Sequence, residues 1–414
     1  MTGRGGRALA AIAAGNALEF YDFLIFQTFA IQIGAAFFPK YDAYGQLLWA
    51  LATFGVGFLT RPLGSVVIGR FGDRVGRRPA MLLSFALTGL AMAGLALTPA
   101  YASIGIAAPL LAMLLRLVQG FALGGEVGPS TALMIETAPA DRRGFYIAFQ
   151  HATQYAAILL SGLVGLVLAH LLSPAALAGI GWRIAFLLGA AAVPYGYWLR
   201  RGLTETLPEP APPPPVTAGH ARVALTGLFL LAATSISIYV VIYMSTYAIR
   251  TLGFAPGSAF VATVASGIAG FVCALLGGRL SDRIGRKRVM GASALALFLL
   301  VLPAFAAVNA WRTPAALLAT SGLLGGLLGL CGPPVLASIA EGLPPGLRGT
   351  GLGLVYALAN AIFGGTAQFI VTWLIHVTGS PLAPAWYMMA ALAVGLAAVA
   401  LARETAPARI RSGA

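Results

Sequence analysis

The sequence Gly69-Arg70-Phe71-Gly72-Asp73-Arg74-Val75-Gly76-Arg77-Arg78 returns in related form as Gly278-Arg279-Leu280-Ser281-Asp282-Arg283-Ile284-Gly285-Arg286-Lys287. A second, looser pair matches Glu136-x-x-Pro139 with Arg143-Gly144 to Glu341-x-x-Pro344 with Arg348-Gly349. The members of both pairs are separated by nearly the same distance along the chain. Two independent matches at one separation indicate an internal repeat, so we predict a chain made of two related halves.

Outside these loops the chain of 414 residues is mostly apolar. Hydrophobic residues make up 59% of it and charged residues 9%, with a mean hydropathy of +0.88. A soluble domain carries about 25% charged residues, so lipid is predicted to be the solvent for most of this chain. Twelve apolar segments reach the length of about 20 residues that a membrane helix needs. They lie near residues 9–36, 46–70, 79–98, 104–137, 144–172, 182–200, 222–250, 257–280, 288–307, 314–340, 348–377 and 384–402.

A polar, proline-rich stretch separates the sixth segment from the seventh. It includes Pro208, Pro210 and the run 212–215, and such a run favours extended polyproline II structure over helix. We therefore predict an all-α membrane protein with twelve transmembrane helices in two six-helix, pseudo-symmetric bundles. The bundles are residues 1–200 and 222–414, joined by a cytoplasmic linker at 201–221. Transporters built from repeats of this kind place their site between the halves.

The net charge of +14 could indicate a nucleic-acid partner. The basic residues lie in short loops rather than on one face of a soluble fold, so we predict no such partner. Drawing twelve spans gathers nearly all of them on one side, which predicts that both termini are cytoplasmic. The first apolar stretch contains Glu19 and Asp22 and is too long and polar for a cleaved signal peptide. We expect a multi-pass protein of the bacterial inner membrane that contacts the lipid bilayer.

Nothing in the sequence indicates a metal, a cofactor or an enzyme. Cys273 and Cys331 lie inside apolar segments far apart, and the four histidines lack metal-ligand spacing. No span carries a nucleophile–base pair. We expect no cofactor, and a monomer, since the fold requires no oligomer.

The repeated loop, Gly-x-x-x-Asp-Arg-x-Gly-Arg-Arg, resembles the loop signature of the major facilitator superfamily, and the resemblance covers the whole chain. Its metabolite:proton symporter branch, which handles citrate, 2-oxoglutarate, proline and betaine, is resembled at three places. They are Gly15-Asn16-Ala17-Leu18-Glu19-Phe20-Tyr21-Asp22-Phe23, Arg61-Pro62-Leu63-Gly64, and Arg116-Leu117-Val118-Gln119-Gly120 through Gly125-Glu126. Two further stretches are most similar to the citrate and tricarballylate symporters. These are Gly144-Phe145-Tyr146 with Gln150 and Gln154, and Tyr356-x-x-x-Asn360-Ala361-Ile362-Phe363-Gly364-Gly365.

Five ionisable side chains fall deep within spans of the first half, and none does so in the second. They are Glu19, Asp22, Arg61, Arg116 and Glu126. Charges inside a bilayer are costly, and those that persist usually face a cavity or a partner. A static buried ion pair is the alternative, but such pairs stabilise little relative to apolar residues, so a functional site is favoured.

A direct ion pair between Asp22 and Arg116 would couple the binding of a proton to the binding of an anion. The planar guanidinium of Arg116 suits a carboxylate, and protonation of Asp22 would free it to bind one. Anion binding would in turn favour the protonated acid. The resemblance supports these two roles, because related transporters pair an acid of span one with an arginine of span four. Glu19 and Glu126 are candidates for further proton sites.

Polar side chains at helical spacing predict the rest of the substrate site. With Arg116, the predicted set is Asn16, Gln119, Gln150, Gln154, Tyr239, Tyr243, Tyr356 and Asn360. The alternative for each pair is an interhelical hydrogen bond.

The repeated loops predict a gate. The resemblance implies ion-pair latches that hold the outward-open state and break on inward opening; anchoring by the positive charges alone is the alternative. The gate residues are Asp73, Arg77, Glu136, Arg143, Asp282, Arg286, Glu341 and Arg348.

These patterns predict a proton-coupled symporter that imports a small organic anion by alternating access, with citrate or a similar tricarboxylate as the first choice of substrate. The alternatives are symport of 2-oxoglutarate, betaine or proline, and a transporter-like sensor that binds its ligand without turnover.

Overall fold

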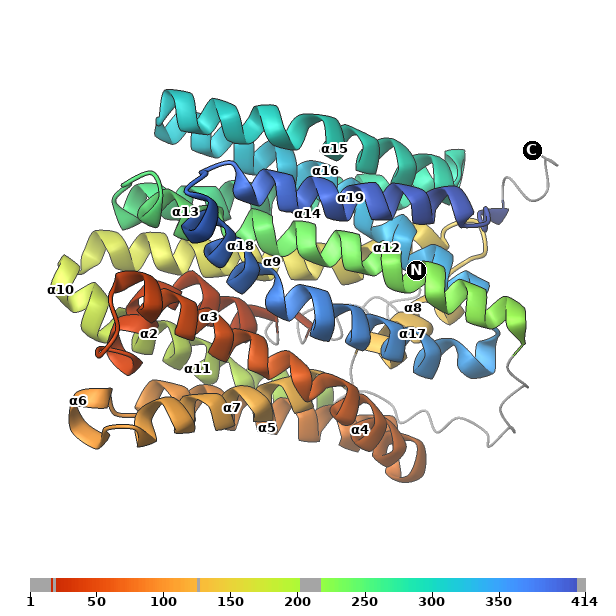
Figure 1. Cartoon of the computed structure of the whole chain (residues 1–414). Helices are drawn as coiled ribbons and strands as arrows, with labels where there is room; N and C mark the ends of the chain where they lie inside the picture. Colours follow the sequence, from red (N-terminus) through yellow and green to blue (C-terminus); the bar gives the residue numbers. More distant parts are fainter. Residues whose placement is uncertain (1–15, 18–19, 125–126, 202–216, 408–414) are drawn as a thin grey trace.

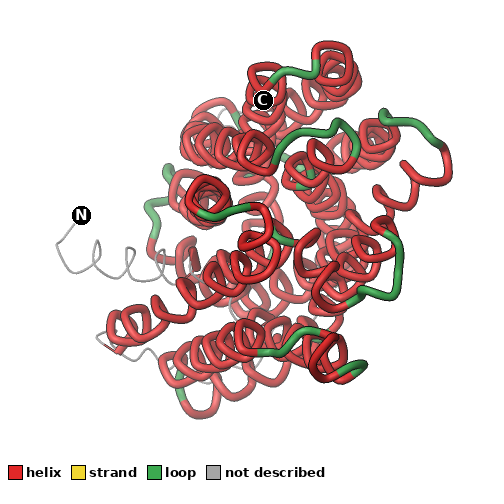
Figure 2. The backbone as a smooth tube through the Cα atoms, turned by 90° about the vertical axis from the view of Figure 1, so that its left-hand side faces the viewer, coloured by secondary structure: helices red, strands yellow, loops and turns green. Residues whose placement is uncertain are grey.

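The protein is a bundle of long, roughly parallel helices (Figure 1). The computed structural model describes residues 16–17, 20–124, 127–201 and 217–407, and these ranges contain no β-strand. Seen from the end, many of the helices project as closed circles, as expected for spans that cross a membrane side by side (Figure 2).

The first half contains a helix over Phe20–Thr28, followed by elements α2 to α11. Their bounds are α2 (Ala30–Phe37), α3 (Ala43–Leu59), α4 (Arg61–Val75), α5 (Arg77–Leu97), α6 (Tyr101–Ile104), α7 (Ala107–Gly124), α8 (Val127–Thr137), α9 (Arg143–Leu171), α10 (Pro174–Ala176), the π-helix η1 (Leu177–Gly181) and α11 (Trp182–Arg201).

The second half contains elements α12 to α19. Their bounds are α12 (Ala218–Ile242), α13 (Met244–Arg250), α14 (Pro256–Ile284), α15 (Arg286–Trp311), α16 (Pro314–Gly342), α17 (Pro345–Ala359), the π-helix η2 (Asn360–Gly364), α18 (Gly365–Thr378) and α19 (Ala383–Leu401). The proline-rich segment lies outside the described residues, so the boundary between the halves stays a prediction.

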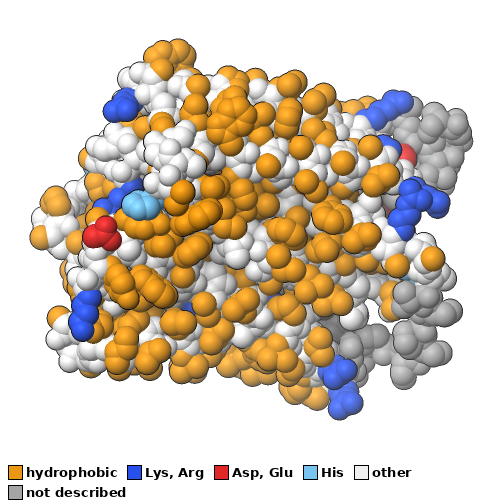
Figure 3. Space-filling model, in the orientation of Figure 1, with side chains coloured by type: hydrophobic (Ala, Val, Ile, Leu, Met, Phe, Trp, Pro, Cys, Tyr) orange, Lys and Arg blue, Asp and Glu red, His pale blue; other side chains and the backbone are white. Residues whose placement is uncertain are grey.

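The predicted set of twelve spans is confirmed. Within the described residues, eleven helices are long and apolar enough to cross a membrane, and a bent pair of helices makes the twelfth. Apolar side chains cover the middle of the face in Figure 3, while lysines and arginines lie toward its ends. This distribution is the one that a bilayer requires, because charged side chains that face lipid are costly away from its surfaces.

The first span is not a straight helix. It bends by 69° between Phe20–Thr28 and α2. The hydroxyl of Thr28 donates a hydrogen bond to the carbonyl of Leu24 (3.0 Å), a back-bond that bends helices. The bend lies about two turns beyond Asp22 and Phe23, two residues of the functional site.

Close helix contacts fix the position of the site. A Cβ atom on Gly120 of α7 would lie only 1.5 Å from the carbonyl oxygen of Gly57 in α3. Glycine at position 120 therefore lets the two backbones touch, as small residues do in membrane bundles. The contact holds the start of α4, which carries Arg61, against the part of α7 that carries Arg116.

The halves pack against each other through α9 with α14, α8 with α17, and α3 with α18. Helices far apart in sequence therefore enclose the middle of the molecule. We call the end with the α4–α5 and α14–α15 turns the loop face; both turns follow even-numbered spans and so lie at the same end.

Candidate functional site

A chain of hydrogen bonds links an acid of the first span to an arginine of α7. The amide nitrogen of Gln119 donates to Oδ1 of Asp22 (2.7 Å), and Nη1 of Arg116 donates to the amide oxygen of Gln119 (2.6 Å). All three side chains are fully buried. The expected direct ion pair is absent between these two described residues, because Gln119 stands between the charges and carries their interaction.

Aromatic rings hold Arg116 where an ion pair was expected. The guanidinium carbon lies 3.9 Å from the ring centroid of Phe23, 4.7 Å from Phe26 and 5.1 Å from Phe54. Each contact of this kind contributes roughly 0.5–2 kcal/mol. Its Nε and Nη2 atoms are buried and have no hydrogen-bond partner among the described residues. The cation is thus stabilised, but its donors are not all used.

A second arginine shares one of these rings. The guanidinium carbon of Arg61 lies 4.4 Å from the centroid of Phe23 and 4.1 Å from Phe58. Its Nε and Nη2 atoms are also buried with no partner in the described ranges. The sequence placed Arg61 among the buried ionisable groups without giving it a role. Glu19 and Glu126, the other two members of that group, lie outside the described residues.

A cavity of about 70 Å³ lies between the halves. Four predicted substrate residues line it: Gln154, Tyr239, Tyr356 and Asn360. His151 and Ser235 line it too, and the predictions had not assigned these two to the site. Their signal was helical spacing, since His151 lies between Gln150 and Gln154, and Ser235 lies one turn before Tyr239.

The other predicted substrate residues do not line this cavity. Asn16 donates to the hydroxyl of Thr153 (2.6 Å) and accepts from the amide nitrogen of Gln150 (3.1 Å), which ties the first span to α9. The hydroxyl of Tyr243 accepts from Thr372 (2.9 Å). For these three residues the structure shows interhelical hydrogen bonds. Arg116 and Gln119 belong to the buried chain described above.

A smaller pocket of about 10 Å³ adjoins the cavity. Arg61 and Leu123 line it together with Phe20 and Tyr356, and the last two also line the cavity. The cavity and the Arg61 pocket therefore meet at Phe20 and Tyr356.

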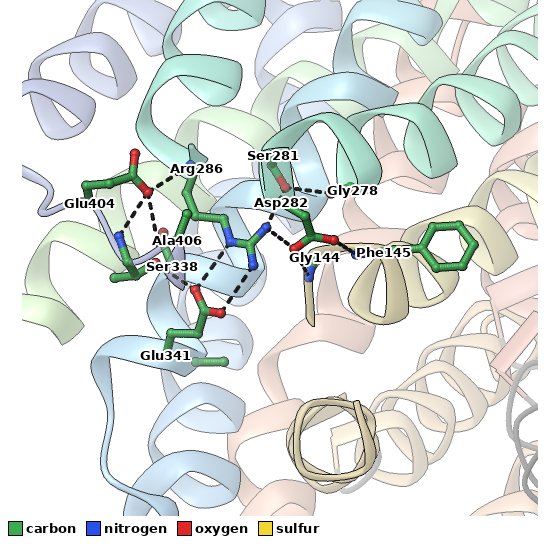
Figure 4. A network of polar contacts seen from close by, with 12 residues as sticks. Gly144, Phe145, Gly278, Ser281, Asp282, Arg286, Ser338, Glu341, Glu404 and Ala406 are labelled. Carbon is green, nitrogen blue, oxygen red and sulfur yellow. Dashed lines mark hydrogen bonds and ion pairs between the residues drawn. The ribbon is translucent and has the colours of Figure 1, made fainter. Parts of the chain in front are cut away.

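A second buried network lies at the loop face (Figure 4). Nη1 of Arg286 donates to Asp282 (2.7 Å), while its Nε and Nη2 atoms donate to the two oxygens of Glu341 (3.3 and 3.2 Å). The carboxylate of Asp282 also accepts from the backbone N–H groups of Gly144 (2.8 Å) and Phe145 (2.9 Å). These N–H groups lie at the start of α9, where a carboxylate is stabilised by free donors and by the helix dipole.

This network joins the two halves, since Asp282 belongs to α14 and α9 to the first half. The gate prediction placed Asp282, Arg286 and Glu341 together, and the structure brings them together. The segment after α19 was not anticipated. Glu404 accepts from the backbone N–H groups of Arg286 (2.9 Å) and Lys287 (3.1 Å), and the hydroxyl of Thr405 donates to Glu341 (2.7 Å).

The remaining predicted gate residues are arranged differently. Arg348 donates to the backbone carbonyls of Ala340 (2.7 Å) and Leu343 (3.4 Å) instead of to a carboxylate. Arg143 and Glu136 lie close enough for their charges to act on it. The side chains of Asp73 and Arg77 lie outside the described part of the structure.

Twelve spans with a buried polar site between two halves define a multi-pass membrane transporter. The comparisons give the family: the model of the Major Facilitator Superfamily matches residues 20–358 and 225–413, and the chain belongs to that family. A citrate-proton symporter of Salmonella typhi is 34% identical over 95% of this chain and 93% of its own length. The alpha-ketoglutarate permease of Escherichia coli is 35% identical over 92% of this chain and 90% of its own.

A crystal structure of a D-xylose-proton symporter matches the fold. Its TM-score is 0.78 at 18% identity, with 96% of this chain and 98% of that chain covered. This likeness supports the architecture predicted from the sequence. The relatives are transporters rather than enzymes, in agreement with the prediction that this chain is not an enzyme.

Proposed function

We propose that the protein is a proton-coupled symporter that imports a small organic anion, with citrate or a similar tricarboxylate as substrate. The observation that carries the proposal is the buried chain from Asp22 through Gln119 to Arg116. An acid and a guanidinium cation held apart by one amide form an arrangement that protonation can switch. The citrate-proton symporter among the relatives supports the choice of substrate.

The coupling step follows from the hydrogen-bond inventory. Ionised Asp22 can only accept, so it fixes the amide of Gln119 with its NH₂ toward the carboxylate and its oxygen toward Arg116. Oδ2 of Asp22 has no partner in the described ranges, which leaves it free to take the proton. Protonation removes the negative charge and releases the amide to reorient, so that the positive charge of Arg116 is no longer balanced. The anion then restores that balance.

Membrane voltage explains why protons must accompany the substrate. Moving an anion into a negative interior costs about 2.3 kcal/mol per charge per 100 mV. A citrate-like trianion must therefore bring several positive charges with it. Glu19 and Glu126 are the proposed additional proton sites.

The alternative substrate with specific support is a dicarboxylate. It is supported by the similarity to the alpha-ketoglutarate permease, which is 35% identical over 92% of this chain. Betaine and proline remain outcomes of the test below, as does a sensor that binds without transport.

We propose further that the loop face is cytoplasmic, with both termini on that side of the bacterial inner membrane, because the basic residues gather there. The functional unit is a monomer surrounded by lipid, and residues 1–200 and 222–414 are the two bundles that rock around the cavity.

Liposome uptake tests the proposal. Purified protein is reconstituted with an imposed inward proton gradient, and uptake of labelled citrate, tricarballylate, 2-oxoglutarate and betaine is compared. Asp22→Asn removes the titrating group but keeps the size and the hydrogen-bond acceptor. We expect it to abolish accumulation, by at least 100-fold, while substrate exchange across the membrane persists.

Asp42→Asn is the matched control, because Asp42 is exposed and asparagine also caps the start of α3. Its uptake should equal that of the unchanged protein. Citrate uptake that survives dissipation of the gradient would refute proton coupling, and binding of citrate without any uptake would favour the sensor.

A further inference from the structure

We propose that Arg61, rather than Arg116, binds a carboxylate of the substrate, and that His151 and Gln154 bind a second polar group of the substrate at the cavity wall. The inference rests on the proposed transport of an organic anion and assigns the residues that recognise it. It predicts that the preferred ligands are hydroxycarboxylates and polycarboxylates.

The cavity itself supplies no full charge. Its described lining consists of apolar side chains and neutral polar ones such as Gln154, Tyr239, Tyr356 and Asn360. Burying a carboxylate among neutral groups is unfavourable unless a cation or several donors compensate for its lost hydration. An anion in the cavity therefore needs a cation that it can reach from there.

Arg61 is the arginine that meets this need. It lines the smaller pocket, which shares Phe20 and Tyr356 with the cavity. Tyr239, another residue of the cavity wall, lies beside the Arg61 side chain. Phe20 and Tyr356 border both spaces, so a shift of these two side chains would join them.

The free donors of Arg61 suit a carboxylate. Nε and Nη2 are neighbouring atoms of one planar group, and both are buried without a partner in the described part of the chain. Two parallel N–H donors in this geometry bind the two oxygens of a carboxylate together. The rings of Phe23 and Phe58 hold the guanidinium group by its carbon atom and leave these donors unoccupied.

Arg116 is placed for a different task. Three phenylalanine rings surround it, Nη1 is bound to Gln119, and it lines neither space. A ligand would have to displace the rings to reach it. Phe23, which contacts both guanidinium groups, is the physical link through which the protonation of Asp22 acts on Arg61.

Two further polar groups on the cavity wall have unpartnered atoms. Nδ1 of His151 and the amide nitrogen of Gln154 are buried, line the cavity wall and have no hydrogen-bond partner among the described residues. Buried polar atoms are rarely left unpaired, so this pair points to a ligand group that completes them. Betaine has one carboxylate and no second hydrogen-bonding group, whereas citrate and 2-oxoglutarate have both.

Binding measurements on the full-length protein test the assignment. The dissociation constants of citrate, tricarballylate, 2-oxoglutarate and betaine are measured by titration calorimetry for the unchanged protein and for Arg61→Gln, Arg61→Lys and Arg116→Gln. We expect Arg61→Gln to weaken citrate binding by at least 30-fold, and Arg61→Lys, which keeps the charge but loses the fork, by roughly tenfold. Arg116→Gln should weaken it less than Arg61→Gln.

Gln154→Leu provides a second, independent variant should Arg61→Gln fail to fold as a monodisperse protein. It should weaken citrate binding at least fivefold and leave betaine binding within twofold. Equal losses for both ligands would refute the second contact.

The ligand panel separates this inference from the proposed function. If the unchanged protein binds citrate and Arg61→Gln still binds it within threefold, Arg61 is not the anchor, although the function stands. If the protein binds only betaine and Arg61→Gln abolishes that binding, the anchor holds while the proposed substrate is wrong. Failure of the unchanged protein to bind any of the four would overturn both.

Discussion

Two clusters of buried charge lie in this protein, and they differ in how completely their hydrogen bonds are formed. At the loop face, every guanidinium nitrogen of Arg286 donates to Ser281, Asp282 or Glu341. In the middle of the first half, Arg61 and Arg116 each keep two buried nitrogens without a described partner. Both clusters are buried to a similar degree, so burial alone does not distinguish them.

The difference separates a fixed contact from an exchangeable one. A fully paired cluster has no donor left for a ligand. Its hydrogen bonds and ion pairs instead depend on how close α14, α16 and the start of α9 lie to one another. An incompletely paired cluster holds donors in place for a ligand that is not part of the chain. Burial of unpaired donors is unfavourable, so a ligand that accepts hydrogen bonds from them is bound more tightly.

Arg286→Met should have the largest effect, because it breaks the paired cluster. It leaves Asp282 and Glu341 buried without their cation, and loss of one partner from a buried pair costs about 3–5 kcal/mol. The closed arrangement of the loop face should become a minor state. Spin labels at positions 141 and 283, in a background lacking Cys273 and Cys331, would report the widening by electron–electron distance measurement.

Arg288→Met is the control for this variant, since Arg288 is exposed one position beyond Lys287 on the same helix. An unchanged distance distribution in Arg286→Met would show that the cluster does not hold the halves together.

Gln119→Leu should have an intermediate effect on the incompletely paired cluster. It removes both hydrogen bonds that connect Asp22 with Arg116 and keeps a side chain of similar size. Loss of hydrogen bonds to buried charged groups costs about 1.5–3 kcal/mol, or roughly tenfold to 150-fold. The ratio of protons to substrate molecules, measured from the accumulation reached at known gradients, should fall.

Gln46→Leu removes an amide that bonds the backbone of Tyr41 in an exposed position, and its transport should be unaffected. A stoichiometry in Gln119→Leu equal to that of the unchanged protein would exclude the amide as the connection between Asp22 and Arg116.

Thr405→Val should have the smallest effect. It removes one hydrogen bond to Glu341 at the edge of the paired cluster, which contributes about 0.5–1.5 kcal/mol. The same label pair should show a small increase in the open population, clearly below that of Arg286→Met. An effect as large as that of the arginine variant would mean that the segment after α19, rather than the Arg286 ion pairs, holds the loop face closed.

The fold followed from the sequence because hydropathy and the repeated loops act over long segments. About twenty apolar residues specify a membrane span whatever their order. One polar residue among them changes the mean hydropathy of the segment only slightly. The bend after Phe20–Thr28 could not be predicted in this way, since no proline marks it, and the hydrogen bond from the hydroxyl of Thr28 to the carbonyl of Leu24 is seen only in the structure.

The site was predictable in its residue types but not in its contacts. The sequence placed Asp22 and Arg116 in the same region, but the packing of the first span against α7, which puts Gln119 between them, is visible only in the structure. Arg61 had a usable signal, an arginine deep in an apolar span. Glu404 and Thr405 had none, because they follow the last span in a polar segment where such residues are common.

The π-helix at Asn360–Gly364 has a consequence for the rotational phase of the span that contains it. Such a turn accommodates one extra residue, and every side chain beyond it is rotated by about 100° relative to an unbroken α-helix. Gln368 and Thr372 face Tyr239 and Tyr243 only because of this rotation. The wide turn thus aligns two parts of one helix separately, Tyr356 and Asn360 toward the cavity and the following turns toward α12.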